Sequence, residues 1–324
     1  MILTLTLNPS LDRTVELPAP LRRGAVQRAS GARQDAGGKG VNISRALRAS
    51  GTATLALLPG DAGDPLLAEL AAADVPYEAV PAGAPIRSNI TITEPDGTTT
   101  KLNAPGTPLR PEQLEAVVEL LTTRGRDASW VVLAGSLPPG ADADVYARIV
   151  RRVRAALGAR APRFAVDTSG PALSGATSDD DALPDLIKPN GEELAELVGT
   201  GNGERLEADP DLAATTAAAL VARGLGAVLT TLGAGGAVLT VPGGSWHAVH
   251  APVAVRSTVG AGDSSLAGYL LAHERGDAPH ECLRQAVASG SAAAALPGTR
   301  VPALAETAPE AVTVRELFPH AVSG

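Results

Sequence analysis

Apolar and polar positions follow two alternating periods through the chain beyond its first third. Leu114, Val117, Val118 and Leu121 lie three or four positions apart, which predicts a helix, and the continuous apolar run at residues 130–134 predicts a short buried strand. Strands that alternate with helices in this way form a mostly parallel sheet covered on both faces. We therefore expect an α/β protein.

The same alternation continues toward the C-terminus. Further helices are expected at residues 145–157, 194–197 and 212–222, and further strands at residues 164–167, 186–188 and 227–231. Ligands of such sheets bind at the carboxyl ends of the strands, so the functional site is expected at that edge.

The first hundred residues have a different pattern. After an apolar first strand at residues 1–7, residues 86–102 contain two β-rich stretches around Asp96-Gly97, a dipeptide typical of hairpins. We expect a small β lid, formed from about residues 13–34 and 86–103, over the edge where substrates bind.

Nothing in the pattern divides the chain further. No repeat or long linker separates a second domain, so residues 1–324 are expected to form a single domain. The polar, turn-rich stretches at residues 179–181 and 199–211 are expected to be exposed loops.

Composition and charge limit the class of function. A hydrophobic share of 44% is ordinary for a globular protein, and a net charge of −8 argues against nucleic acid or an anionic membrane as partner. Without a signal peptide or spanning segment, a cytoplasmic location is expected. The single cysteine, Cys282, excludes an internal disulfide and agrees with a reducing compartment.

A glycine-rich turn that leads into an apolar helix is the strongest local signal. The amides of Gly260, Ala261 and Gly262 would point at an anion, and the helix dipole adds to this attraction. Asp263 follows in the first turn, where an ionised carboxylate could accept a proton beside a transferring group. The turn alone equally fits a simple helix cap, so both interpretations stay open at this point.

A second glycine turn before a helix lies near the other end of the chain. In Asp35-Ala-Gly-Gly-Lys-Gly-Val-Asn, Gly37 and Gly38 allow a close approach of the backbone to sugar hydroxyls. Asn42 can both donate and accept hydrogen bonds, and Lys39 supplies a point charge for a substrate phosphate. The spacing is not that of a Walker A loop.

With these motifs the sequence resembles the PfkB (ribokinase-like) carbohydrate kinases, and within them the branch of 1-phosphofructokinases and tagatose-6-phosphate kinases. Six motifs in family order carry the resemblance over nearly the whole chain: Thr6-Leu-Asn-Pro-Ser-Leu-Asp-Arg-Thr, Gly37-Gly-Lys-Gly-Val-Asn, Ala134-Gly-Ser-Leu-Pro-Pro-Gly, Lys188-Pro-Asn-Gly-Glu-Glu-Leu, Thr231-Leu-Gly-Ala-Gly-Gly and Val259-Gly-Ala-Gly-Asp.

The resemblance implies a ribokinase-like three-layer fold, with a mostly parallel central sheet flanked by helices and a small β lid. It also implies roles for individual residues. Asp263 would be the catalytic base, and Gly260, Ala261 and Gly262 the anion hole. Substrate-binding positions would be Asp12, Gly37, Gly38, Lys39, Asn42, Arg87 and Ser136. ATP-binding positions would be Lys188, Asn190, Glu193, Thr231, Gly233 and Gly235, with Glu193 acting indirectly on the Mg²⁺ that accompanies ATP.

The implied reaction is phosphoryl transfer from MgATP to O6 of fructose 1-phosphate. Tagatose-6-phosphate kinase and 6-phosphofructokinase remain alternatives, because the shared motifs do not say which end of the ketose carries the phosphate. A non-catalytic sugar-phosphate sensor is disfavoured by the presence of Asp263, Asn190 and Glu193. Ser257 replaces an acidic residue of many relatives, which puts monovalent-cation dependence in doubt. A homodimer through the lid is also implied by resemblance.

Overall fold

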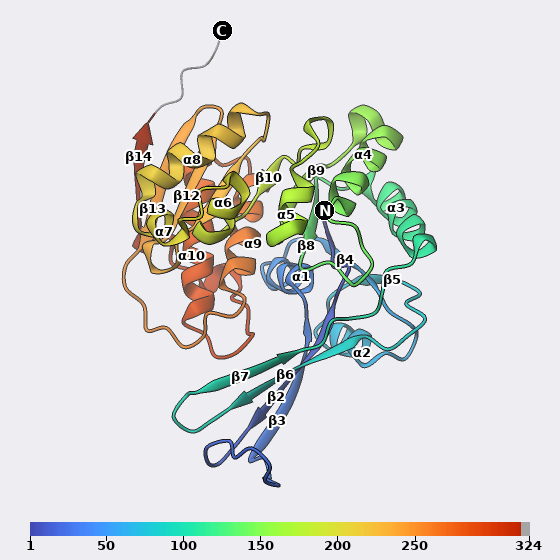
Figure 1. Cartoon of the computed structure of the whole chain (residues 1–324). Coiled ribbons are helices and arrows are strands. Elements are labelled where there is room, and N and C mark those ends of the chain that lie inside the picture. The colour runs from blue at the N-terminus through green and yellow to red at the C-terminus, as the bar shows by residue number, and fades with distance from the viewer. Residues whose placement is uncertain (319–324) are drawn as a thin grey trace.

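Two sheets organise the chain in the computed structural model, which describes residues 1–318 (Figure 1). The strands of the larger sheet are, in spatial order, β14 (Val312–Phe318), β13 (Gly244–His250), β12 (Ala237–Val241), β11 (Val228–Thr231), β10 (Leu186–Ile187), β9 (Arg163–Asp167), β8 (Trp130–Ala134), β1 (Ile2–Leu5), β4 (Thr54–Pro59) and β5 (Tyr77–Val80). Neighbours from β5 to β11 pair in parallel, and β11 to β14 pair antiparallel.

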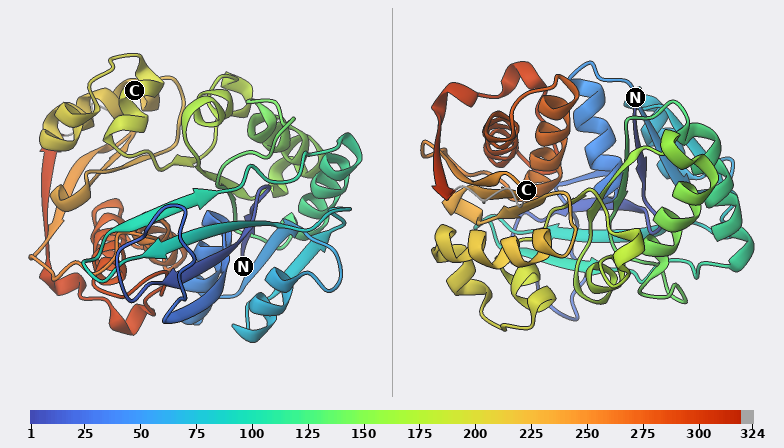
Figure 2. Two further views of the ribbon diagram at one scale, coloured as in Figure 1. Left: turned by 60° about the horizontal axis from the view of Figure 1, so that its bottom comes forward. Right: turned by 90° about the horizontal axis from the view of Figure 1, so that it is seen from above.

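Helices cover both faces of this sheet (Figure 2). They are α1 (Lys39–Ala49), α2 (Pro65–Ala72), α3 (Pro111–Gly125), α4 (Val145–Leu157), α5 (Gly170–Ala176), α6 (Gly191–Val198), α7 (Gly203–Ala208), α8 (Pro210–Ala222), α9 (Ala261–Glu274) and α10 (Pro279–Ala294). The three-layer α/β fold expected from the alternating pattern is thereby confirmed.

Alternation along β8 shows how the sequence assigns the two faces. Val131 and Leu133 pack with α3 and α4 on one face, whereas Trp130 and Val132 pack with α1, α9 and α10 on the other. All residues of β8 are buried, because a parallel strand between two helical layers needs an apolar side chain on each face.

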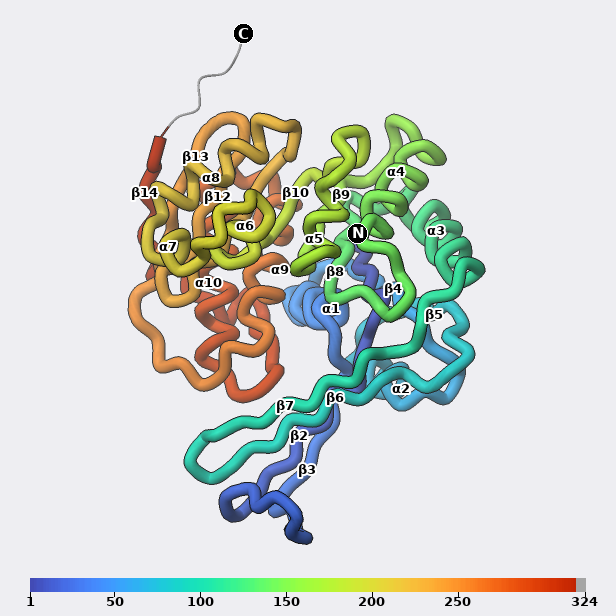
Figure 3. Tube along the Cα trace, viewed as in Figure 1, coloured from blue at the N-terminus to red at the C-terminus, as the bar shows by residue number. Residues whose placement is uncertain are grey.

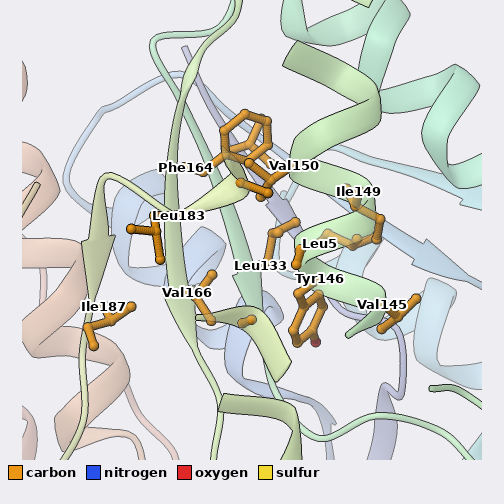
Figure 4. Packing of buried hydrophobic residues seen from close by; sticks show 14 of the residues in the cluster. Leu5, Leu133, Val145, Tyr146, Ile149, Val150, Phe164, Val166, Leu183 and Ile187 are labelled. Atoms are coloured by element: carbon orange, nitrogen blue, oxygen red, sulfur yellow. The ribbon is translucent and has the colours of Figure 1, made fainter. Parts of the chain in front are cut away.

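Aliphatic side chains dominate the core, and Figure 4 shows one part of it. Tyr146 and Phe164 are fully buried there among Leu133, Val150 and Val166. The Tyr146 hydroxyl donates to the backbone oxygen of Gly135, so the aromatic ring is buried without an unpaired polar group.

The second sheet projects from the body of the molecule (Figures 1 and 3). Its strands are, in spatial order, β3 (Gly31–Gly37), β2 (Ser10–Glu16), β6 (Arg87–Thr93) and β7 (Thr99–Asn103). The turn between β6 and β7 contains Gly97, whose φ of 89° is one that glycine tolerates. These are the segments from which the sequence analysis builds its lid.

The expectation that residues 199–211 form only an exposed loop is wrong. They include α7, in which Leu206 is buried against the core, and the Asp209 side chain caps α8 by accepting from the amides of Asp211 and Leu212. A six-residue helix with a single buried apolar side chain is too short to show a helical period. No helix among the described residues is long and apolar enough to cross a membrane.

Candidate active site

Asp263 lies in the first turn of α9, at the edge formed by the carboxyl ends of the parallel strands. Gly260 precedes the helix with a φ of 78°, a left-handed conformation that glycine adopts without strain. Gly262 and Asp263 are the second and third residues of the helix, so their amides have no carbonyl one turn earlier to bond. The turn therefore presents backbone donors beside a carboxylate that is only 7% exposed.

The second glycine turn opens α1 directly beside α9. Gly38 has a φ of 119°, and a Cβ at this position would lie 2.8 Å from the Thr6 side chain. One turn into α1, the Asn42 side chain donates a hydrogen bond of 2.8 Å to Oδ2 of Asp263. The two turns, one from each end of the chain, thus meet at one carboxylate.

Asp167, at the end of β9, joins both lysines of the site and was missed by the sequence analysis. Lys39 Nζ donates to its Oδ1 at 2.7 Å, and Lys188 Nζ lies 3.2 Å from its Oδ2. The carboxylate is fully buried. Its position at the carboxyl end of a parallel strand is the signal that could have identified it.

Burial and these charges together set the protonation of the site. Burial, followed by the negative charge of Asp167, raises the pKa of Asp263 to about 6, although Lys39 and the Asn42 hydrogen bond oppose the change. Burial also favours the neutral forms of Asp167 and Lys39, but the charges of Lys188 and Lys39 outweigh it for Asp167, and the charge of Asp167 outweighs it for Lys39. The pKa of Asp167 is therefore lowered and that of Lys39 raised.

Two consequences follow for Asp263. Burial and the Asp167 charge favour its protonated form, which is the opposite of the effect expected of the helix dipole. A carboxylate with a pKa of about 6 is still mostly ionised at pH 7, and it is more basic than an exposed aspartate.

Asp12 and Gly37 form a tightly fitted pair on β2 and β3. Oδ1 of Asp12 accepts hydrogen bonds from the Ser10 hydroxyl at 2.7 Å and from the Asn89 amide at 3.0 Å. A Cβ on Gly37 would lie 2.2 Å from the other carboxylate oxygen. Only glycine at position 37 leaves room for Asp12 in this orientation.

Arg87 and Ser136 both contact the segment around Asn8. The Arg87 guanidinium donates to the backbone oxygens of Asn8, Pro9 and Ala104, at 3.0, 3.3 and 2.8 Å. These bonds join the small sheet to the body and leave two of the five N–H groups for an anion. The Asn8 amide donates to the Ser136 hydroxyl at 3.3 Å, which orients that loop.

Asn190 and Glu193 form a reciprocal helix cap at the start of α6. Oδ1 of Asn190 accepts from the amide of Glu193 at 2.7 Å, and Oε2 of Glu193 accepts from the amide of Asn190 at 2.9 Å. Asn190 also forms an isolated β-bridge with Thr231, at the end of β11.

The loop after β11 follows Thr231 and so lies next to the cap of Asn190 and Glu193. Gly233 and Gly235 form one short helical turn, and Nε2 of His247 lies 2.8 Å from the Gly235 oxygen. Lys188 links this loop region to the α9 turn, since a Cβ on Gly262 would lie 3.1 Å from its Nζ. Ser257 accepts from the amide of Val259, which stabilises the approach to that turn.

The sequence matches those of known proteins over nearly its whole length. Residues 5–306 match the family described as pfkB family carbohydrate kinase. The chain is 37% identical to the 1-phosphofructokinase of Rhodobacter capsulatus, over 98% of both chains. It is 36% identical to the 1-phosphofructokinase of Haloferax volcanii, over 97% of this chain and 99% of the other.

The fold has close counterparts among solved structures. One is the crystal structure of phosphofructokinase-2 from Escherichia coli in complex with fructose-6-phosphate. It superimposes with a TM-score of 0.83 at 29% sequence identity, covering 94% of this chain and 96% of that chain.

Proposed function

Because the chain belongs to the pfkB family of carbohydrate kinases, we propose that it transfers the γ-phosphoryl group of ATP to O6 of fructose 1-phosphate, giving fructose 1,6-bisphosphate and ADP. The observation that carries the proposal is the buried Asp263 beside the free amides of the α9 turn. The similarity to two 1-phosphofructokinases over nearly the full chain supports the choice of acceptor.

Asp263 is the base in this proposal. It removes the proton from the acceptor hydroxyl as the phosphoryl group arrives, and its pKa of about 6 keeps it ionised at neutral pH yet basic enough to take the proton. Of the predicted anion hole of Gly260, Ala261 and Gly262, the Ala261 amide already donates to the backbone oxygen of Thr258 at 3.4 Å. The amide of Gly262, with that of the neighbouring Asp263, donates to the phosphoryl oxygens at the same turn. Fixed donors of this kind stabilise charge that develops in the transition state.

The two lysines provide the positive charge of the site. Lys39 extends from the α1 turn and is partly exposed, which suits a contact with the phosphate that the substrate already carries. Lys188 is buried between Asp167 and Gly262, which suits the phosphates of ATP. The cap of Asn190 and Glu193, together with Thr231, Gly233 and Gly235, provides the remaining nucleotide side.

Mg²⁺ is the proposed cofactor and would enter with ATP. No cluster of three or more His, Cys, Asp or Glu side chains within the described part of the chain could hold a metal by itself. Mg²⁺ in kinases is bound mainly by phosphate oxygens and water, with one or two carboxylates, so the residues present fit it. Glu193 would act on it indirectly, and the ion would neutralise charge on the phosphates.

Fructose 6-phosphate is the second candidate acceptor. The E. coli relative has been solved with this ligand, and the residues that surround Asp12 do not specify which end of the ketose bears the phosphate. Tagatose 6-phosphate presents the same chemistry and is a third acceptor of this type.

A coupled assay of ADP release tests the proposal. Fructose 1-phosphate, fructose 6-phosphate, tagatose 6-phosphate and fructose are compared with MgATP, and we expect the highest kcat/KM with fructose 1-phosphate. A preference for a 6-phosphate would reassign the acceptor but keep the kinase chemistry. No turnover with any of them would favour a sugar-phosphate sensor over an enzyme.

We also propose that the small sheet acts as a lid, that it carries a homodimer contact, and that the enzyme works in the cytoplasm, where ATP and sugar phosphates are found. Ile90 and Leu102 support the dimer, since they are paired across β6 and β7 and are 37% and 55% exposed. Leu102→Asp should lower the mass measured by sedimentation, whereas Val26→Asp in an exposed loop should not. A parent that sediments as a monomer would overturn the dimer.

A further inference from the structure

A cavity of about 370 Å³ lies at the amino ends of the parallel strands, on the edge opposite Asp263. Trp130 and Arg163 begin β8 and β9 there, and Tyr269 and His273 come from the last turns of α9. Apolar wall is added by Ala227, Val241, Pro279 and Cys282. The volume is within the range of small-molecule sites, and none of the proposed kinase residues lines it.

One contact in this cavity sets an N–H donor against a second N–H group. Nε1 of Trp130 lies 3.4 Å from Nδ1 of His273, and Nη1 of Arg163 lies 3.2 Å from Nε2 of the same ring. Indole and guanidinium nitrogens only donate, whereas a neutral imidazole has a single acceptor nitrogen. Either the Trp130 N–H or the Arg163 N–H therefore faces the N–H group of the His273 ring. An acceptor placed beside them would receive hydrogen bonds from both of these opposed N–H groups.

Arg163 also carries a positive charge that no carboxylate in residues 1–318 pairs with. Its guanidinium carbon lies 5.9 Å from the centre of the Trp130 ring. Asp185 and Asp277 line the cavity too, but each is engaged by another arginine, Arg154 and Arg275 respectively. Among the described residues of the cavity, the charge without an ionic partner is therefore cationic, and Arg163 holds it at an exposed position.

We propose that this cavity binds a small organic anion with a flat apolar body, such as an aryl carboxylate or an aryl phosphate. Its anionic oxygens accept hydrogen bonds from Arg163 and from the ring N–H of His273, and its body packs against Tyr269 and the apolar wall. Burial, followed by the Arg163 charge, holds the pKa of His273 below its usual value, and a bound anion offsets the Arg163 charge.

Tryptophan fluorescence tests the proposal directly, because the chain has only two tryptophans and Trp130 lines the cavity. In a Trp246→Phe background, phenyl phosphate and benzoate are titrated while the emission of Trp130 is followed. We expect a saturable change with both anions, and none with benzyl alcohol, which lacks the charge, or with inorganic phosphate, which lacks the apolar body.

Variants then locate the bound anion. Arg163→Ala should weaken binding about ten-fold or more, because charge-assisted hydrogen bonds are lost. Arg163→Lys should retain part of the affinity, and Arg160→Ala, which removes an exposed arginine three residues away, should bind like the parent. Kinase activity and melting temperature check that each variant is folded. No saturable change up to about 10 mM of either anion, or equal binding by Arg163→Ala, would overturn the proposal.

Discussion

The side-chain amide of Asn42 donates to Oδ2 of Asp263 at 2.8 Å, although 221 residues separate them in the sequence. The bond stabilises the ionised carboxylate, whereas burial and the nearby charge of Asp167 favour the protonated form. The pKa of about 6 results from this balance. Asn42 therefore influences the proposed base directly, in addition to any contact with the sugar.

Loss of that hydrogen bond should change the pH dependence of turnover. The proposed base works only when ionised, so kcat of the parent should fall below about pH 6, by roughly ten-fold per pH unit. In Asn42→Ala the pKa of Asp263 rises further, and we expect the acid limb to move up by as much as about one unit. The measurement is a pH profile of kcat for both proteins.

Phosphate groups of the substrates also titrate near pH 6, so the comparison between variants is the decisive one. Their ionisation is the same with either protein, and only the contribution of Asp263 moves. Asn202→Ala, at an exposed position without a side-chain cap bond, is the matched control and should keep the parent profile. An acid limb in Asn42→Ala that coincides with the parent's would contradict a role in setting the pKa.

Replacement of the base itself should separate catalysis from binding. Asp263→Asn keeps the size of the side chain but cannot accept the proton, so we expect kcat to fall by about 10² to 10⁴. ATP affinity should change little, because the amides of the turn remain. Single-turnover kinetics and ATP binding by calorimetry measure the two effects. Near-parental turnover in this variant would refute the assignment of Asp263.

The same variant should also be more stable at neutral pH. The raised pKa means that ionised Asp263 costs stability above about pH 6, by up to about 3 kcal/mol at roughly 1.4 kcal/mol per pKa unit. Below about pH 4 the carboxyl is protonated in the folded and unfolded chains alike, and the cost disappears. Asp263→Asn should therefore melt above the parent at pH 7.5, with a difference that narrows toward pH 4. A lower melting temperature at pH 7.5 would contradict the raised pKa.

The spacing of apolar residues was sufficient to predict those parts of the fold in which burial follows a regular pattern. The run of β8 is buried on both faces, and α4 buries Val145, Ile149, Val153 and Leu157 at helical spacing, so both could be predicted. Helix α7 could not, because its position depends on one buried leucine. Local spacing carries no information about such isolated contacts.

The site was predictable in its motifs but not in its charge network. Glycine turns mark Gly38 and Gly260 in the sequence, since each has a left-handed φ. Asp167 appears only as an aspartate after a strand, and its pairing with Lys39 across 128 residues depends on the order of strands in the sheet. The bonds of Arg87 to backbone oxygens depend likewise on how the small sheet joins the body.

Removal of the Asp167 charge should destabilise the fold. Asp167→Asn leaves Lys188, with a side chain only 6% exposed, without its carboxylate partner, and breaking such a buried pair costs about 3 to 5 kcal/mol. Because the pKa of Asp167 is lowered in the folded state, its contribution is present at neutral pH and is lost as pH falls below about 4. Urea denaturation at pH 7 and near pH 3 measures how much of this contribution is lost.

Asp142→Asn provides the matched control for this experiment. Asp142 pairs with Arg148 on the surface, with its side chain 76% exposed, and such pairs contribute at most about 1 kcal/mol. We expect the control to unfold close to the parent at both pH values. If Asp167→Asn lowers the free energy of unfolding as little as the control does, the pairing of Lys39 and Lys188 with Asp167 does not stabilise the fold.

A methyl group at position 37 should weaken binding of the sugar phosphate and leave binding of ATP nearly unchanged. In Gly37→Ala the new Cβ would lie 2.2 Å from Oδ2 of Asp12, so the carboxylate must turn away from its present orientation. If Asp12 holds a sugar hydroxyl as proposed, KM for the sugar phosphate should rise about ten-fold or more. KM for ATP should stay within about two-fold, because the nucleotide side is untouched. Steady-state kinetics with each substrate varied in turn measures both constants.

Gly243→Ala controls for the general effect of adding a methyl group to a glycine. Nothing lies within 4 Å of a Cβ at position 243, in the turn between β12 and β13, so both KM values should match the parent. The distinction between the two KM values in Gly37→Ala is what identifies Asp12 as a sugar-binding group. An equal rise in both would indicate a general disturbance of the fold, and no rise in either would exclude Asp12 from the sugar site.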